Sequence, residues 1–262
     1  MTAPFAHERP LPLLPLRAGM VLPGTVVTLP VGRQRSRALV SAVAVDSLIV
    51  LGVQRDPTVK HPGRHDLHDI AVLARVKQKN DHGSRGSLVH VEGLERVHLR
   101  DVVGEEPYMR VTTSALLEVD ADSPEAAALA SSLRAQLLAS PELGDASFRR
   151  MLDQTEEPGR LADRIVASID APPELRVEVL LETNVVARLR NVVEILGKAR
   201  AAAQMRENID SEVRRELNKN QRDAVLREQL KAIKRQLGNE GGDDNPLRAK
   251  LEKLDLPPEV KE

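Results

Sequence analysis

The feature that most constrains the fold is a long stretch without helix breakers. Residues 182–237 contain no proline, and Gly197 is their only glycine. Apolar residues recur in this stretch at steps of three and four, the spacing of one face of a helix. Charged side chains fill the positions between them. We expect a single helix of about 50 residues, which would be about 75 Å long.

Only the first third of this helix carries enough apolar residues to pack in a bundle. Further along, the apolar stripe is narrow, as in a coiled-coil-like arm. Ile209, Val213 and Leu217 belong to this stripe and are candidate contact residues. A break is expected at residues 239–245, and a further helix is expected from Pro246.

Residues 1–118 predict strands. Short apolar runs, alternating or β-branched, are separated by segments rich in Pro and Gly, which is typical of a small β-domain. The expected strands are 11–16, 25–31, 47–53, 70–76, 87–91, 96–102 and 108–119, and a short helix is expected at 33–45. Two prolines in the first run favour an edge strand or an extended lead-in, because proline cannot donate to a ladder. The pattern indicates a barrel-like domain.

The spacing of apolar residues changes from a strand-like to a helix-like pattern near Ser123-Pro124. This pair suits the cap and the first position of a helix. The expected helices that follow are 125–139, 145–154, 158–169 and 172–181, separated by prolines. The fold class is therefore α+β. We divide the chain into a β-rich domain at 1–118, a helical bundle at 119–200, and an arm with a linker at 201–262.

Composition excludes several classes of protein. Phe5, Tyr108 and Phe148 are the only aromatic residues, so the core must be aliphatic, and base-stacking modules for nucleic acids are disfavoured. The net charge of −1 gives no field that attracts polyanions. The chain has no cysteine, which excludes disulfides and thiolate metal sites.

Location follows from two absences in the sequence. No apolar run approaches the roughly 18 residues of a membrane span. Residues 1–10 lack the basic-then-apolar layout of a secretory signal. We expect a cytoplasmic protein without membrane contact.

Three segments resemble the Lon family of ATP-dependent proteases. Residues 11–17, with 21–24 and 29–33, are similar to the family's amino-terminal signature. Residues 91–97 (VEGLERV) resemble its strand-turn-strand, and residues 221–238 resemble the helix that precedes its ATPase module. The resemblance implies a PUA-like β-domain followed by a helical bundle with a long protruding helix.

The resemblance also implies a role. Such a region captures unfolded, damaged or tagged proteins for a hexameric ATPase ring, and the full-length enzyme is an ATP-dependent serine endopeptidase. ATP and Mg²⁺ are then expected in an ATPase domain beyond this chain, and no residue here is expected to be catalytic or to bind a cofactor. The sequence departs from the family at Asp223, Ala224 and Val225, where aromatics are common, and at Leu22, where Phe is frequent.

Candidate substrate contacts are therefore aliphatic. Unfolded chains expose apolar segments and strand-forming backbone, so an open sheet edge or an aliphatic stripe would complement them. We select the edge at Val21, Leu22 and Pro23, and the stripe Ile209, Val213 and Leu217. The alternatives are that Leu22 is a core residue and that the stripe is a seam for self-association or interdomain contact.

Other motifs favour structural roles. Gly197-Lys198 lacks the remaining residues of a phosphate-binding loop. His61, His65 and His68 have spacings seen in zinc sites, but Pro62 and Gly63 favour a solvated loop.

Arg33, Arg35 and Arg37 favour a solvated helix face. Their contact with phosphate, and so with DNA or RNA, stays open as a weaker alternative.

Overall fold

The computed structural model describes residues 9–17, 20–81, 86–139, 145–169 and 171–239. The chain divides into two compact units, residues 1–200 and 201–262, and each is described by itself. The longest helix, α6 (Val185–Asn239), has turns in both units. The long helix expected from the proline-free stretch is therefore confirmed.

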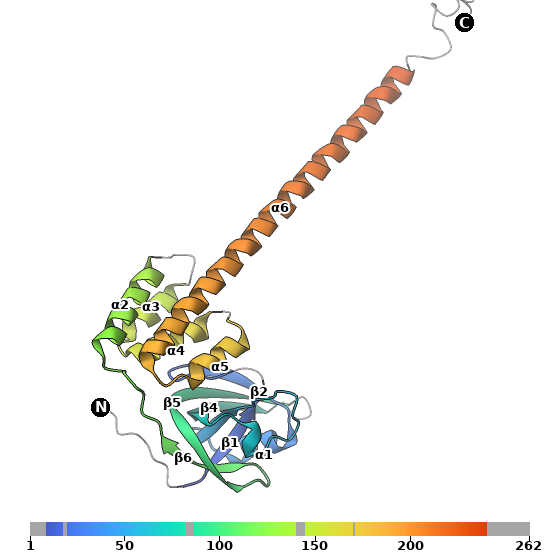
Figure 1. Cartoon of the computed structure of the whole chain (residues 1–262). Helices are drawn as coiled ribbons and strands as arrows, with labels where there is room; N and C mark the ends of the chain where they lie inside the picture. Colours follow the sequence, from blue (N-terminus) through green and yellow to red (C-terminus); the bar gives the residue numbers. More distant parts are fainter. Residues whose placement is uncertain (1–8, 18–19, 82–85, 140–144, 170, 240–262) are drawn as a thin grey trace, which may run out of the picture. The chain divides into compact units, whose positions relative to one another are not determined.

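Six strands form one mixed sheet in the first unit (Figure 1). They are β1 (Leu11–Leu16), β2 (Val26–Val31), β3 (Leu48–Val53), β4 (Ile70–Asp81), β5 (Ser87–Gly104) and β6 (Arg110–Ala115). Neighbours pair in the order β2-β5-β4-β3-β1-β6, and β6 also pairs with β5. Five strands therefore close into a ring with β2 outside it. The expected α+β class, with a barrel-like sheet, is confirmed.

The expectation of an edge strand at Leu11–Leu16 is wrong, because β1 lies between β3 and β6. The strand can contain its two prolines because of where they lie in the ladder. Pro12 precedes the pairing with β3, which begins at Leu13, and Pro15 lies beyond the last bond to β6, from Leu13 N–H to Met109 O (2.8 Å). Neither proline sits where the ladder requires a donor.

The strands bury both of their faces. Alternate residues of β1, β3, β4 and β5 belong to two separate apolar clusters, the smaller of which includes Leu13, Val50, Leu73 and Val97. The larger cluster continues into the helices of the first unit. Burial of both faces explains why residues 47–53 are a continuous apolar run.

Residues 91–97 do not form the expected strand-turn-strand. They lie within the continuous strand β5, and a register shift in the pairing with β4 occurs beside Leu94. Gly93 is required there because a Cβ atom would lie 2.5 Å from the Leu22 carbonyl oxygen. Backbone bonds from Gly24 N–H to Gly93 O (2.8 Å) and from Gly93 N–H to Thr25 O (2.9 Å) fix this crossing.

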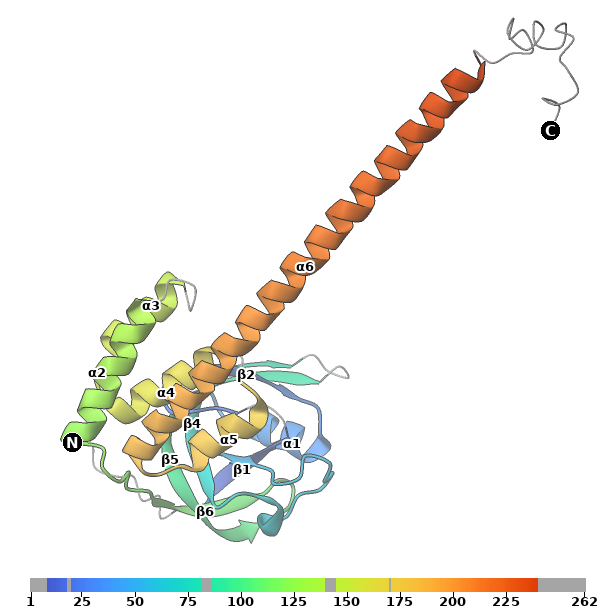
Figure 2. The ribbon, with the colours of Figure 1, turned by 45° about the horizontal axis from the view of Figure 1, so that its top comes forward.

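Five shorter helices accompany the sheet. They are α1 (Gln34–Ala42), α2 (Pro124–Leu138), α3 (Ala146–Gln154), α4 (Pro158–Ser168) and α5 (Pro173–Leu181). Ser123 caps α2 by accepting a bond from Ala126 N–H (3.1 Å), as its sequence predicts. In both views α1 lies on the opposite side of the barrel from α2 and α3 (Figure 2).

The first turns of α6 complete the helical layer of the first unit. Val185, Leu189, Val192 and Leu196 are buried, as expected for the bundle part of the long helix. None of the helices in the described ranges has the length and apolar character of a membrane span. The expected helix from Pro246 lies outside the described residues, and the domain boundaries at 118 and 200 stay predictions.

Candidate functional site

The selected edge at Val21, Leu22 and Pro23 is buried. Val21 and Leu22 belong to the larger apolar cluster, and Pro23 lies beside them in the turn that follows. Pro23 and Gly24 (φ +76°) form the centre of this turn, in which Thr25 N–H donates to Leu22 O at 3.2 Å. The alternative left open for Leu22, a core position, is the one observed. Val21 and Leu22 offer a substrate no exposed apolar surface in this conformation.

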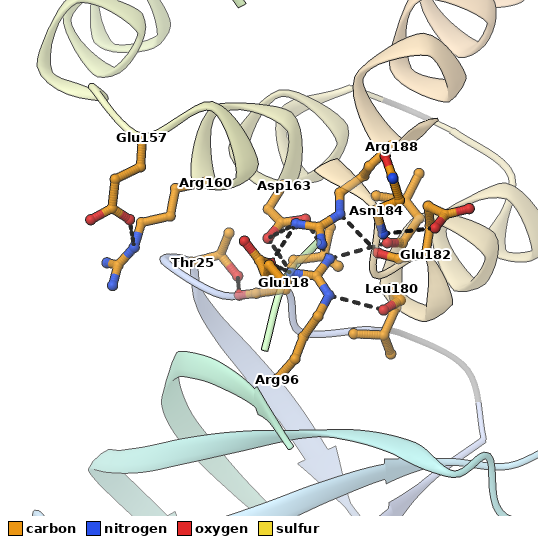
Figure 3. Close-up of polar contacts among 12 residues, drawn as sticks. Thr25, Arg96, Glu118, Glu157, Arg160, Asp163, Leu180, Glu182, Asn184 and Arg188 are labelled. Atoms are coloured by element: carbon orange, nitrogen blue, oxygen red, sulfur yellow. Dashed lines mark hydrogen bonds and ion pairs between the residues drawn. The ribbon is translucent and has the colours of Figure 1, made fainter. Parts of the chain in front are cut away.

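A cluster of four charges, three of them buried, joins the sheet to the helices of the first unit (Figure 3). Arg96 of β5 donates two hydrogen bonds of 2.6 Å to the carboxylate of Asp163 in α4. Its guanidinium also donates to the carbonyls of Leu180 (2.9 Å) and Val179 (3.1 Å) at the end of α5. One side chain of the sheet therefore contacts two helices at once.

Arg188 of α6 extends this cluster. It is fully buried, and its Nη1 lies 2.8 Å from Oε1 of Glu118 and 3.7 Å from Asp163. Its Nε donates to the Glu182 carbonyl at 3.0 Å. Gly159 permits this approach, because a Cβ there would lie 2.6 Å from Glu118 Oε2. Two cations and two carboxylates thus share one site, with formal charges that cancel.

Burial and ion pairing oppose each other in this cluster. Burial raises the pKa of Asp163 above its ordinary value, against the opposing effect of Arg96. Burial disfavours the Arg96 cation too, but the charge and hydrogen bonds of Asp163, with Glu118, outweigh it and raise the pKa of Arg96. The bidentate geometry is the strong form of such a pair. The cluster therefore links β5 to α4, α5 and α6.

This cluster was not among the sites predicted from the sequence. A signal was present, because Arg188 lies three residues after Val185 and four before Val192, at a position that the helical period assigns to the buried face. Asp163 similarly lies among the buried residues of α4. A charge at a position expected to be apolar predicts a buried partner, but the spacing alone does not identify that partner.

A groove lies between the start of α1, the end of β1 and the connection from β5 to β6. We call it the α1 groove, and its volume is about 650 Å³. Its lining residues are Leu13, Pro15, Arg17, Arg33, Gln34, Arg35, Ser36, Ala38, Lys60, His61, Pro62, Glu106, Pro107, Tyr108 and Met109. Prolines, Tyr108 and buried apolar residues thus lie next to four cationic side chains and one carboxylate.

Two of the arginines that the sequence singled out line this groove. Arg35 pairs with Glu106, and Arg33 Nη2 donates to Gln54 Oε1 at 2.6 Å. Nη1 of Arg33 is buried and has no hydrogen-bond partner among the described residues. Burial, and then the charge of Arg17, lower the pKa of Arg33. The groove is therefore a cationic concavity.

The predicted stripe lies in the second unit, where the described residues are helical. Ile209, Val213 and Leu217 are about half exposed (52%, 49% and 62%). Further exposed apolar side chains of the same helix are Met205, Val225, Leu226, Leu230 and Ile233. The structure therefore presents the stripe to solvent, in contrast to the edge at residues 21–23.

The histidine loop folds around a short helical turn, Arg64–Asp66. His65 lies 3.4 Å from Asp66, while His68 is half-buried. Within the described ranges, no three His, Cys, Asp or Glu side chains gather closely enough to hold a metal ion. Gly197-Lys198 lies inside α6.

A family model described as the ATP-dependent protease La (LON) substrate-binding domain matches residues 10–198. The chain is 42% identical over 260 residues to Lon protease 4 of Sorangium cellulosum (strain So ce56), covering 98% of this chain and 32% of that protein. It is 34% identical over 262 residues to Lon protease of Brevibacillus choshinensis, covering 97% of this chain and 34% of that protein. The chain thus spans about a third of the length of these curated relatives.

The fold has a matching solved structure. The N-terminal domain of Mycobacterium avium complex Lon protease aligns with a TM-score of 0.56 at 17% identity, covering 71% of this chain and 97% of that one. This likeness concerns the fold. The family model covers well over half of the sequence, so the chain belongs to the family of Lon substrate-binding domains.

Proposed function

We propose that this chain is the substrate-recognition and assembly region of a Lon-type ATP-dependent serine protease and that it binds unfolded or damaged proteins. The observation that carries the proposal is the exposed apolar stripe of the second unit, at Ile209, Val213 and Leu217. The match of the chain to a substrate-binding family supports the same role.

The stripe suits an unfolded partner for a physical reason. Soluble proteins seldom expose many large apolar side chains along one element unless a partner covers them. Unfolded chains expose apolar segments, and each Å² removed from water contributes about 25 cal/mol. Binding through aliphatic side chains requires no fixed ring geometry, which suits substrates of varied sequence. It also fits a helix that carries Asp223, Ala224 and Val225 in place of the aromatics that the family resemblance led us to expect.

The remaining chemistry belongs to other parts of a longer protein. ATP, Mg²⁺ and the serine nucleophile would be held in domains outside this chain, which spans about a third of its relatives. Assembly into a hexamer and a cytoplasmic location complete the proposal. The absence of cysteine supports a reducing compartment.

A binding assay with an unfolded protein tests the proposal. A permanently unfolded, labelled protein is titrated with the chain without ATP, and binding is followed by fluorescence anisotropy. The triple variant Ile209→Ser, Val213→Ser and Leu217→Ser removes the apolar groups. A matched control changes the next residue in each case: Asp210→Ser, Arg214→Ser and Asn218→Ser.

The apolar variant should bind at least tenfold more weakly, because burying one aliphatic side chain contributes about 1.5–3 kcal/mol. The control variant should bind as the wild type does. Circular dichroism must show equal helicity in both variants, since both carry three serines. Equal binding by the wild type and the apolar variant would remove the stripe from the proposal, and no binding by the wild type would refute substrate recognition.

Self-association is the second candidate for the same helix. Leu226, Leu230 and Ile233 follow steps of four and three, the spacing of a coiled-coil seam. Sedimentation that depends on concentration, together with no binding of unfolded protein, would favour a purely structural role. Binding of DNA or RNA is the weakest alternative, and it predicts affinity that falls steeply with salt.

A further inference from the structure

The α1 groove combines two properties that the proposed function does not use. Its lining includes the apolar residues Pro15, Pro62, Tyr108 and Met109. It also includes four cations, Arg17, Arg33, Arg35 and Lys60. We propose that this groove binds the carboxyl-terminal end of an apolar peptide, with the α-carboxylate at the start of α1. The proposal rests on the proposed function, because such a peptide end would belong to a protein substrate.

The amino-terminal end of α1 has features that favour binding of an anion. No side chain caps this helix, and its first turn contains no acidic residue. The amino end of a helix carries unpaired N–H groups and a partial positive charge. Gln34, Arg35 and Ser36 of this first turn line the groove. A carboxylate placed there would accept bonds from N–H groups that no side chain caps.

The cations around this turn lack enough anions. Glu106 is the one carboxylate in the lining, and it pairs with Arg35. Among the described residues, Arg17 and Lys60 form no ion pair, and Arg33 Nη1 is buried without a hydrogen-bond partner. Unpaired Arg17 and Lys60 next to a single, already paired carboxylate leave the groove with an excess of positive charge, which an anionic ligand would balance.

The apolar lining of the groove determines which kind of residue can carry the bound carboxylate. A volume of about 650 Å³ falls in the range of about 300–1,000 Å³ that is usual for ligand sites. Leu13 and Met109 are buried at its base, and Pro15 and Tyr108 are partly exposed at its wall. Such a wall favours an apolar side chain next to the anion.

A nucleic acid fits less well. It would present a row of phosphates, whereas the cations of the groove share one concavity with the Glu106 carboxylate. Tyr108 is also the only aromatic side chain in the lining, and single-stranded nucleic acids are bound by stacking on several aromatic platforms. One anion on an apolar chain satisfies the groove better than a polyanion does.

Short labelled peptides test this proposal with the whole chain. One peptide ends in two apolar residues with a free carboxylate, and a second has the same sequence with an amidated end. A third is amidated and carries an internal aspartate. The free carboxylate should bind at least tenfold more tightly than both amides, a difference of about 1.4 kcal/mol. Equal binding of the free and amidated peptides would overturn the proposal, and equal binding of the aspartate peptide would reassign the site to acidic side chains.

Four variants test the position of the site. Arg17→Gln and Arg33→Gln should each weaken binding of the free peptide about tenfold, whereas Arg75→Gln, a surface charge outside the groove, should have no effect. Gln34→Glu separates binding from folding. A carboxylate in the first turn stabilises a helix, yet it would repel the ligand. The proposal requires weaker binding by a protein that is equally stable or more stable, and unchanged binding by Gln34→Glu would contradict it.

The outcome is separable from that of the proposed function. Capture of unfolded protein without binding of any short peptide would refute the groove and leave substrate recognition intact. Binding of the free peptide without capture of unfolded protein would refute recognition of unfolded chains through the helical stripe. Displacement of the peptide by a single-stranded oligonucleotide at a lower concentration than by unlabelled peptide would overturn the assignment in favour of nucleic acid.

Discussion

Removing the Asp163 carboxylate should destabilise the first unit strongly. In Asp163→Ala, the buried Arg96 loses two hydrogen bonds of 2.6 Å and keeps the carbonyls of Val179 and Leu180. Glu118, at 3.4 Å from Arg96 and 2.8 Å from Arg188, would then face two buried cations alone. Breaking a buried pair by removing one partner costs about 3–5 kcal/mol. For a unit of this size, the loss corresponds to a decrease in Tm of about 6–20 °C.

Tyr108 provides a local probe of this unfolding. It is the only tyrosine, the chain has no tryptophan, and it lies in the first unit. Its fluorescence during urea unfolding therefore reports on that unit and not on the second unit's helix. The control is Glu157→Ala, which breaks the exposed pair of Glu157 with Arg160. That change should lower the free energy of unfolding by at most about 1 kcal/mol.

A second variant separates loss of the pair from loss of packing. Arg96→Met with Asp163→Leu replaces both partners with apolar groups, and such replacements of buried pairs are often neutral or stabilising. Arg188 and Glu118 remain as a pair in this variant. It should regain most of the stability that Asp163→Ala loses. If Asp163→Ala costs no more than Glu157→Ala, the cluster does not hold the sheet and helices together as argued.

Two glycines should respond to alanine in opposite directions. Gly93→Ala places a Cβ 2.5 Å from the Leu22 carbonyl and should lower the free energy of unfolding by about 1–3 kcal/mol. Gly197→Ala meets no atom within 4 Å and should raise it by up to about 1 kcal/mol; urea unfolding checks both. Burial, and then Arg55, lower the pKa of His68. The unfolded chain therefore binds more protons near its ordinary pKa of about 6.5, and stability should fall as the pH drops below that value. His68→Gln should remove this contribution to the loss of stability at low pH. A His68 ring signal in the folded protein that titrates at or above about pH 6.5 would contradict the prediction.

The order of elements was predictable because their signals are local. Prolines and capping residues define the helices from α2 onward, and Ser123 caps α2 as its sequence indicates. The closure of the sheet was not predictable in this way. It depends on β6 pairing with both β1 and β5, and no local pattern specifies which strands meet. The same limit explains the error at Leu11–Leu16, where two prolines suggested an edge.

Of the two predicted contact segments, one is exposed and the other is buried, and a similar reason explains the difference. Ile209, Val213 and Leu217 are exposed because the described residues of the second unit form one helix, which has no packed apolar partner among them. Val21 and Leu22 form an equally apolar segment, but it crosses β5 at Gly93 and is covered there. Sequence identified both as apolar. Only the tertiary contact decides which of them faces water.

The position of β2 outside the closed ring has a consequence for aggregation. Within the described sheet, β2 is the strand with an unpaired side, and the carbonyl of Thr25 accepts a bond from Gly93 on the β5 side. Backbone N–H and C=O groups of successive residues point to opposite sides of a strand. Pro30, five residues after Thr25, therefore lies on the side of β2 that faces away from β5, where it offers no N–H. An added strand would find an interrupted ladder. A domain proposed to meet unfolded chains thus limits its own capacity to template their assembly into sheets.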